Sequence, residues 1–178
     1  CEYDSANAFE RAGAKPEICV VRNLDSKALS ESIDNLARSI KESNIIMIPG
    51  GFSGGDEPEG SAKFICAVFR NKKIMEAVTE LLENRDGLML GICNGFQALI
   101  KLGLVPFGKY TDPDSNGPTL TFNNIGRHQS LLSYTRVAST LSPWFAGCST
   151  GDMHTIPISH GEGRFVAGEE LIAEMAER

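Results

Sequence analysis

Hydrophobic positions in the first half of the chain alternate between helical stripes and short, continuous apolar runs. Four segments place apolar residues at helical spacing: 3–13, 30–41, 61–83 with a break near Asn71, and 96–102. Three apolar runs are typical of buried strands: 17–21, 44–48 and 87–91. Strands that alternate with helices over short connections favour a parallel sheet covered by helices.

The second half of the chain has a different pattern. Partial alternation predicts strands at 131–138 and 152–159, a short helical turn at 142–145 and a last helix at 168–178. Residues 103–126 are rich in Gly, Pro, Asn and Asp, which predicts a long surface loop. Because no repeat or linker interrupts the chain, we expect residues 1–178 to form a single α/β domain with an open, mostly parallel sheet flanked by helices.

Composition narrows the classes of function. Hydrophobic residues make up 42% of the chain and charged residues 22%, as in ordinary globular proteins. The net charge of −6 argues against a nucleic-acid partner, which needs an excess of Lys and Arg. No apolar run approaches the roughly 20 residues that span a bilayer. We therefore expect neither a nucleic-acid partner nor a membrane segment, and residues 1–13 are too acidic for a signal peptide.

The five cysteines follow no regular spacing, and none forms a CxxC pair. This pattern predicts neither a disulfide framework nor a metal site. An odd number of free thiols fits the reducing cytosol, so we expect a cytoplasmic protein. Cys19 and Cys66 lie inside apolar segments and are predicted to be buried.

Cys93 stands in a different context from the other cysteines. The segment 91–95, Gly-Ile-Cys-Asn-Gly, follows a predicted strand and opens a predicted helix, which is the pattern of a nucleophile elbow with Cys in place of Ser. Flanking glycines avoid Cβ clashes in so sharp a turn, and the positive end of the helix favours the thiolate. The backbone N–H of Asn94 can then face a developing oxyanion. The alternative is an ordinary tight turn around a small residue.

A second glycine turn, Gly50-Gly51-Phe52-Ser53, follows another predicted strand. The carboxyl ends of parallel strands share one edge of a sheet, where ligands bind. We therefore expect a backbone N–H of Gly51 or Phe52 to complete the oxyanion hole, with a plain turn as the alternative.

His160 is the candidate general base. It directly follows a predicted strand, and Glu162 lies two residues later, on the same side of an extended chain. Glu162 can therefore orient the imidazole and complete a Cys–His–carboxylate triad for acyl transfer. His128 and His154 have weaker contexts, and we interpret them as structural or loop residues.

Four motifs follow one another along the chain: GGFS at 50–53, GICNGFQAL at 91–99, SPW at 142–144 and HGEGRF at 160–165. In this order they resemble the glutaminase domain of phosphoribosylformylglycinamidine synthase, a class I glutamine amidotransferase of purine biosynthesis. The resemblance implies a flavodoxin-like fold, truncated at both ends: the family has a strand before the segment matching 7–13 and more strands after Phe165. The chain would then be a fragment of a larger synthetase.

The resemblance also implies a role for each matching residue. Cys93 would attack the side-chain amide of glutamine and form a glutamyl thioester. His160, held by Glu162, would protonate the departing ammonia and then activate water. Gly51 or Phe52 together with Asn94 would form the oxyanion hole, and Gln97 would contact the substrate.

The implied partner is a synthetase domain or subunit that consumes the ammonia. ATP and Mg²⁺ are expected only in that part, with no cofactor and no metal in this domain. Two other interpretations remain at this stage: a protease-like or stress-response cysteine hydrolase of similar fold, and a non-catalytic docking module. The first typically has histidine directly after the nucleophile, where this chain has Asn94. The sequence leaves open whether the synthetase is fused or separate, and whether the fragment is active alone.

Overall fold

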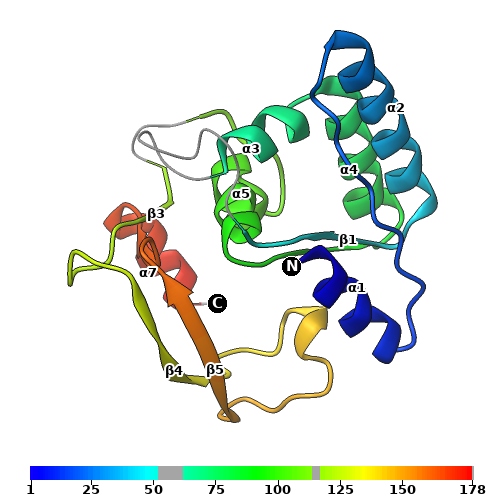
Figure 1. Ribbon diagram of the computed structural model, residues 1–178. Helices are drawn as coiled ribbons and strands as arrows, with labels where there is room; N and C mark the ends of the chain where they lie inside the picture. The colour runs from blue at the N-terminus through cyan, green and yellow to red at the C-terminus, as the bar shows by residue number, and fades with distance from the viewer. Residues whose placement is uncertain (52–61, 114–116, 178) are drawn as a thin grey trace. The chain divides into compact units, whose positions relative to one another are not determined.

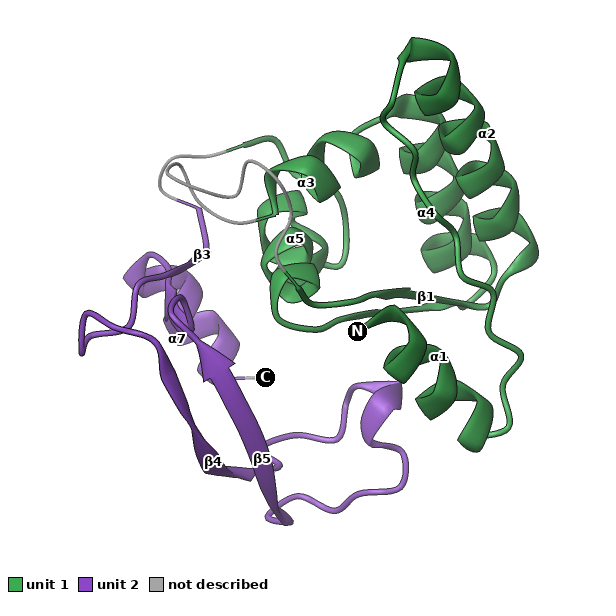
Figure 2. Ribbon diagram, viewed as in Figure 1, with its two compact units in different colours: residues 1–114 green, residues 115–178 purple. Residues whose placement is uncertain are grey.

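The structure is a computed structural model that describes residues 1–51, 62–113 and 117–177 of the chain. Contacts within the chain divide it into two compact units, residues 1–114 and 115–178 (Figure 2). The first unit holds a parallel pair of strands, and the second holds two antiparallel pairs. The predicted α/β class is therefore confirmed, with helices and both kinds of strand pairing.

The first unit follows the predicted alternation of helices and strands (Figure 1). Its helices are α1 (Glu2–Arg11), α2 (Ser26–Glu42), α3 (Lys63–Phe69), α4 (Lys72–Asn84), α5 (Asn94–Leu102) and α6 (Leu104–Phe107). Its strands are β1 (Ile45–Ile48) and β2 (Leu88–Gly91), paired in parallel register from Ile45–Leu88 to Ile48–Gly91. Asn71 caps α4, its side chain accepting a hydrogen bond from the backbone N–H of Lys73, so the helix break falls where it was predicted.

The core of the first unit lies among α2, α4, α5 and the two strands. α2 packs beside α4, and α5 packs against β2 (Figure 1). The most deeply buried large side chains come from α4 and α5: Ile74, Val78, Leu81 and Leu102. Because these residues recur every three or four positions, each helix buries one stripe. The helices thereby support the carboxyl ends of β1 and β2.

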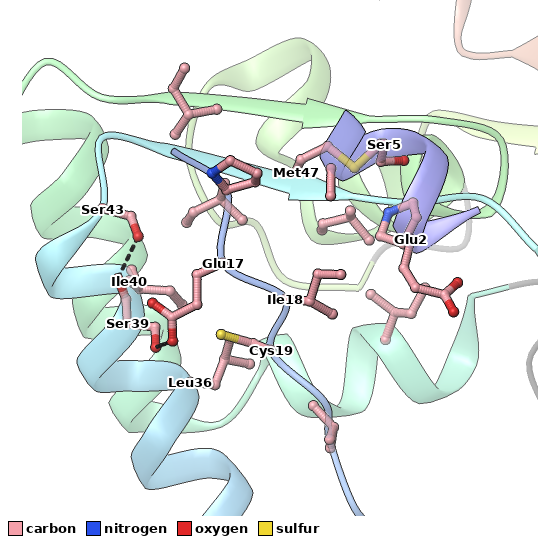
Figure 3. Close-up of a pocket in the computed structure, with 18 of the residues that line it drawn as sticks. Glu2, Ser5, Glu17, Ile18, Cys19, Leu36, Ser39, Ile40, Ser43 and Met47 are labelled. Carbon is pink, nitrogen blue, oxygen red and sulfur yellow. Dashed lines mark hydrogen bonds between the residues drawn. The ribbon is translucent and has the colours of Figure 1, made fainter. Parts of the chain in front are cut away.

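The prediction of a strand at 17–21 is wrong. The segment forms no strand, and Cys19, expected in the core, is exposed, whereas Cys66 is half-buried against the core as predicted. Among the described residues β1 pairs only with β2, so 17–21 does not pair with the other edge of β1. A pocket of about 390 Å³ lies there instead, lined by α1, residues 16–21, α2, β1 and α3. Figure 3 shows Ile18 and Cys19 at this pocket.

The second unit consists mainly of antiparallel strands. Its elements are β3 (Thr119–Thr121), β4 (Gln129–Arg136), η1 (Pro143–Phe145), β5 (Met153–His160), β6 (Arg164–Val166) and α7 (Glu169–Glu177). β4 pairs with β5 and β3 with β6, so the strands predicted at 131–138 and 152–159, the turn at 142–145 and the last helix are confirmed. The predicted loop at 103–126 is wrong in part, because it contains α6 and β3. β6 was not predicted.

Candidate active site

Cys93 lies in the turn between β2 and α5, as the elbow pattern predicts. Its side chain is exposed, and its backbone has φ 53° and ψ −111°, in the positive-φ region that side chains rarely adopt. Two backbone hydrogen bonds close the turn: Gly95 N–H donates to Ile92 at 2.9 Å, and Gln97 N–H donates to Cys93 at 3.0 Å. The turn thus presents the thiol to solvent at the N-terminus of a helix.

Both glycines around Cys93 are required by close packing of the backbone. A Cβ on Gly91 would lie 2.7 Å from the carbonyl carbon of Gly95. A Cβ on Gly95 would overlap the carbonyl group of Ile48 in β1. The first turn of α5 therefore lies directly on the end of β1, and the expectation that the glycines avoid Cβ clashes is confirmed.

The glycine turn after β1 lies beside Cys93. Ile92 N–H donates to the carbonyl of Ile48 at 3.1 Å, which extends the parallel pairing past the strand ends. A Cβ on Gly50 would lie 3.0 Å from the Cβ of Cys93. Gly51 is exposed, with φ 117°. The two turns thus meet at one edge, as expected, while Phe52 lies outside the described residues.

Asn94 and Gln97 occupy the first turn of α5. Asn94 is its first residue, at the N-terminal end of the helix. The side chains of both residues are buried, with exposed fractions of 4% and 7%. Their predicted roles, an oxyanion donor and a substrate contact, stay predictions.

His160 is the last residue of β5 in the second unit and contacts Asn123, a residue that no sequence pattern indicated. His160 Nδ1 lies 3.0 Å from Asn123 Oδ1, which also accepts a hydrogen bond from Gly163 N–H at 3.1 Å. Asn123 Nδ2 donates to the carbonyls of His160 at 2.9 Å and Arg127 at 3.1 Å. The side chain of Asn123 is buried, with all four of its hydrogen-bonding positions occupied.

This network determines which nitrogen of His160 carries the proton. Because Asn123 Nδ2 faces two carbonyls, its amide orientation is fixed and Oδ1 can act only as an acceptor. Nδ1 of neutral His160 must therefore donate, which leaves the lone pair on Nε2. Nε2 is the nitrogen that can take a proton from a nucleophile or water.

Gly163 also fixes the position of the imidazole. A Cβ at this position would overlap the ring of His160, so the ring lies directly against the Gly163 backbone. Glu162, between the two, is half-buried, and its predicted orienting role stays a prediction. Pairing of β3 with β6 explains the arrangement, since the Thr121–Arg164 pair brings the residues after β3 next to those before β6.

The other two histidines are exposed residues of the second unit. His128 Nε2 lies 2.9 Å from Ser159 Oγ, a contact that fits the structural interpretation of this residue. His154 lies in β5 opposite Thr135, so it is a strand residue and not a loop residue. Within the described residues, no helix is long and apolar enough to cross a membrane.

Comparison with known proteins extends the similarity to the whole chain. Residues 1–178 match the family model of the CobB/CobQ-like glutamine amidotransferase domain. Two curated relatives are phosphoribosylformylglycinamidine synthase subunit PurQ from Methanococcus maripaludis and from Dehalococcoides mccartyi. The first is 30% identical over a match that covers 99% of this chain and 59% of the relative. The second is 33% identical over a match that covers 98% of this chain and 62% of the relative.

The solved structure of PurLQS from Thermotoga maritima is similar at a TM-score of 0.67 and 26% identity. The match covers 96% of this chain and 65% of that one. The chain spans about three fifths of the length of the curated relatives it matches. Since the family model matches every residue, the chain belongs to the CobB/CobQ-like glutamine amidotransferase domain family.

Proposed function

We propose that residues 1–178 form a single glutaminase domain, part of a longer protein, that supplies ammonia from glutamine to phosphoribosylformylglycinamidine synthase. The observation that carries this proposal is the exposed Cys93, held at positive φ between two glycines that cannot bear a Cβ. A strained, exposed cysteine at a helix start is suited to nucleophilic attack. Membership of the amidotransferase family supports glutamine as the acyl donor. The names of the curated relatives support the choice of synthase.

In the proposed reaction Cys93 is the nucleophile, and His160 transfers protons in both steps. His160 Nε2 takes the proton of the Cys93 thiol, and the sulfur attacks the side-chain amide carbon of glutamine. The C–N bond then breaks as His160 passes that proton to the leaving nitrogen, which departs as ammonia and leaves a glutamyl thioester. His160 Nε2 then takes a proton from water, whose oxygen attacks the thioester. This step breaks the C–S bond and releases glutamate, and His160 returns the proton to the Cys93 sulfur. In neutral His160 the contact of Nδ1 with Asn123 keeps the lone pair on Nε2, so that Nε2 can accept each of these protons.

Other residues assist without changing bonds. Backbone N–H groups of Gly51 or Phe52 and of Asn94 stabilise the oxyanion of the tetrahedral intermediate. Glu162 stabilises the imidazolium form of His160, and Gln97 contacts the glutamine. The contact of Gly50 with Cys93 supports an oxyanion hole built from both turns.

The partner in this proposal is a synthetase domain or subunit of the same synthase. Ammonia passes to it shielded from water, and ATP with Mg²⁺ acts only there, so this domain needs no cofactor. The similar solved structure is one of PurLQS, which supports such an assembly. Free thiols at the surface fit a location in the cytoplasm.

Affinity labelling tests the proposal without requiring turnover. The purified chain is incubated with a diazoketone or chloroketone analogue of glutamine, and the adduct is located by mass spectrometry. We expect modification at Cys93 that excess glutamine blocks. Cys19 is the matched control, because it is also exposed but lies outside the elbow. Cys19→Ala should leave the labelling intact, whereas Cys93→Ala should abolish it.

The alternatives give different outcomes. Labelling of Cys93 that glutamine does not block would favour the protease-like hydrolase. A folded chain without any labelling would favour the docking module. Equal labelling of Cys93 and Cys19 would show that the elbow has no special reactivity, and the proposal would then be wrong.

A further inference from the structure

Three potential metal ligands gather in the second unit, outside the candidate active site. The sulfur of Cys148, a carboxylate oxygen of Asp152 and a ring nitrogen of His154 all lie within 4.8 Å of one another. Cys148 precedes β5, and His154 is the second residue of that strand. Their spacing, C-x₃-D-x-H, is not a common zinc motif, so the sequence pattern alone gave no sign of them.

Backbone hydrogen bonds hold the turn that carries two of the ligands. Cys148 N–H donates to Phe145 at 2.9 Å, and Asp152 N–H donates to Ser149 at 3.0 Å. One carboxylate oxygen of Asp152 accepts from Ser149 N–H at 2.7 Å. That bond orients the carboxylate and leaves its other oxygen available to a ligand.

The turn is also joined to β4 and β5. Val137 N–H donates to the Asp152 carbonyl at 2.9 Å, and Gly151 N–H donates to the Val137 carbonyl at 2.8 Å. The third ligand, His154, lies in the paired part of β5 opposite Thr135. All three ligands thus stand on backbone that is already ordered, which lowers the entropic cost of binding.

We propose that Cys148, Asp152 and His154 bind a divalent transition-metal ion, with Zn²⁺ the best match. Thiolate and imidazole together select zinc-like ions, whereas Mg²⁺ and Ca²⁺ prefer sites made only of oxygen ligands. Zinc bonds of about 2.0–2.3 Å put neighbouring tetrahedral ligands roughly 3.5 Å apart. Small side-chain rotations bring atoms within 4.8 Å to that spacing.

The exposure of the three residues suits an accessible site. Cys148 is half-buried, and Asp152 and His154 are exposed, so an ion can enter from solvent. Three protein ligands leave one tetrahedral position for water. The ion would tie the turn after η1 to β5. The proposed ligands do not include Cys93 or His160, so the metal site can be tested independently of the proposed function.

Cobalt is the most direct probe, because a Co²⁺–thiolate bond gives an intense near-ultraviolet charge-transfer band. The 178-residue chain is used with the exposed thiols removed as Cys1→Ser, Cys19→Ser and Cys93→Ala. Cys66 remains in this background, but burial raises the pKa of its thiol, which disfavours the thiolate. We expect one Co²⁺ per chain with the thiolate band, and Zn²⁺ should displace it.

Single substitutions in this background identify the ligands. Cys148→Ser should abolish the thiolate band, and His154→Gln should weaken Zn²⁺ binding at least about tenfold in competition with a chromophoric chelator. Asp152→Asn keeps the acceptor for Ser149 N–H while removing the charge, and it should also weaken binding. His128→Gln is the matched control, an exposed histidine of the same unit outside the cluster, and should change neither measurement.

Three results would overturn the proposal. One is the absence of a thiolate band at saturating Co²⁺ in a chain whose circular dichroism shows that it is folded. Another is a band that survives Cys148→Ser. The third is a Zn²⁺ affinity that His154→Gln and His128→Gln lower equally. Circular dichroism of each variant without metal separates lost binding from lost folding.

Discussion

The variant Cys93→Gly should be more stable than the variant Cys93→Ala. Alanine keeps the Cβ, and with it the strain of φ 53° and ψ −111°. Residues held in such sparsely populated backbone regions cost about 1–3 kcal/mol. Glycine removes this strain, but it loses more conformational entropy on folding, by roughly 0.5–1 kcal/mol. The difference leaves Cys93→Gly more stable than Cys93→Ala by about 1 kcal/mol.

Urea denaturation of both variants measures this difference. The side chain of Cys93 is exposed, so loss of its sulfur changes little packing, and the difference between the two variants reports on the backbone. The matched control is the pair Cys19→Gly and Cys19→Ala, at an exposed cysteine without positive φ. There the order should reverse, with glycine the less stable variant. If glycine is also the less stable variant at position 93, the backbone at Cys93 is not strained, and the argument for a functional elbow from backbone strain is refuted.

Three further substitutions test other contacts. Gly163→Ala should slow glutamine-blockable labelling of Cys93 at least about tenfold with little change in stability, because the new Cβ displaces the ring of His160. Gly95→Ala should cost about 3 kcal/mol or more in urea denaturation, since its Cβ overlaps the backbone of Ile48. Tyr110→Phe should stabilise the chain by about 1 kcal/mol, because the buried hydroxyl makes no hydrogen bond within the described residues.

Each of the two glycine substitutions has a control. For Gly163→Ala it is Gly161→Ala, and for Gly95→Ala it is Gly147→Ala, because a Cβ at either control position meets nothing within 4 Å. Equal effects of a substitution and its control would contradict the packing argument. Burial raises the pKa of Tyr110, so the hydroxyl ionises more readily in the unfolded chain than in the folded one. As pH rises above the unfolded pKa of about 10, this ionisation favours unfolding, and the stability of the folded chain falls. Stability of Tyr110→Phe should fall less over that range, and parallel pH profiles would contradict the assignment.

The sequence predicts those elements whose signals are local. The break at Asn71 is an example, because the asparagine that caps α4 satisfies a backbone N–H two residues away. The elbow at Cys93 is another, since its glycines, its strand and its helix are consecutive in the chain. In both cases the chemistry that decides the conformation lies within a few residues.

The failure at 17–21 has a different physical cause. Apolar, β-branched residues make a strand possible, but the hydrogen bonds of a strand must come from a neighbour. Among the described residues, the segment 17–21 does not pair with the second edge of β1, and α2 supplies other contacts instead. Ser39 Oγ donates to Glu17, and Arg22 N–H donates to Ser32 Oγ. The segment is irregular and mostly exposed, and Cys19 is exposed with it.

The partner of His160 lay beyond sequence reasoning for a related reason. Asn123 is 37 residues away along the chain, and an asparagine in a polar segment carries no signal of burial. The pairing of β3 with β6, two strands of three residues each, brings it to the imidazole. Strands this short are hard to predict from alternation, because three residues define barely one period. The sequence therefore indicates His160 as the candidate base, whereas long-range pairing determines which of its ring nitrogens can accept a proton.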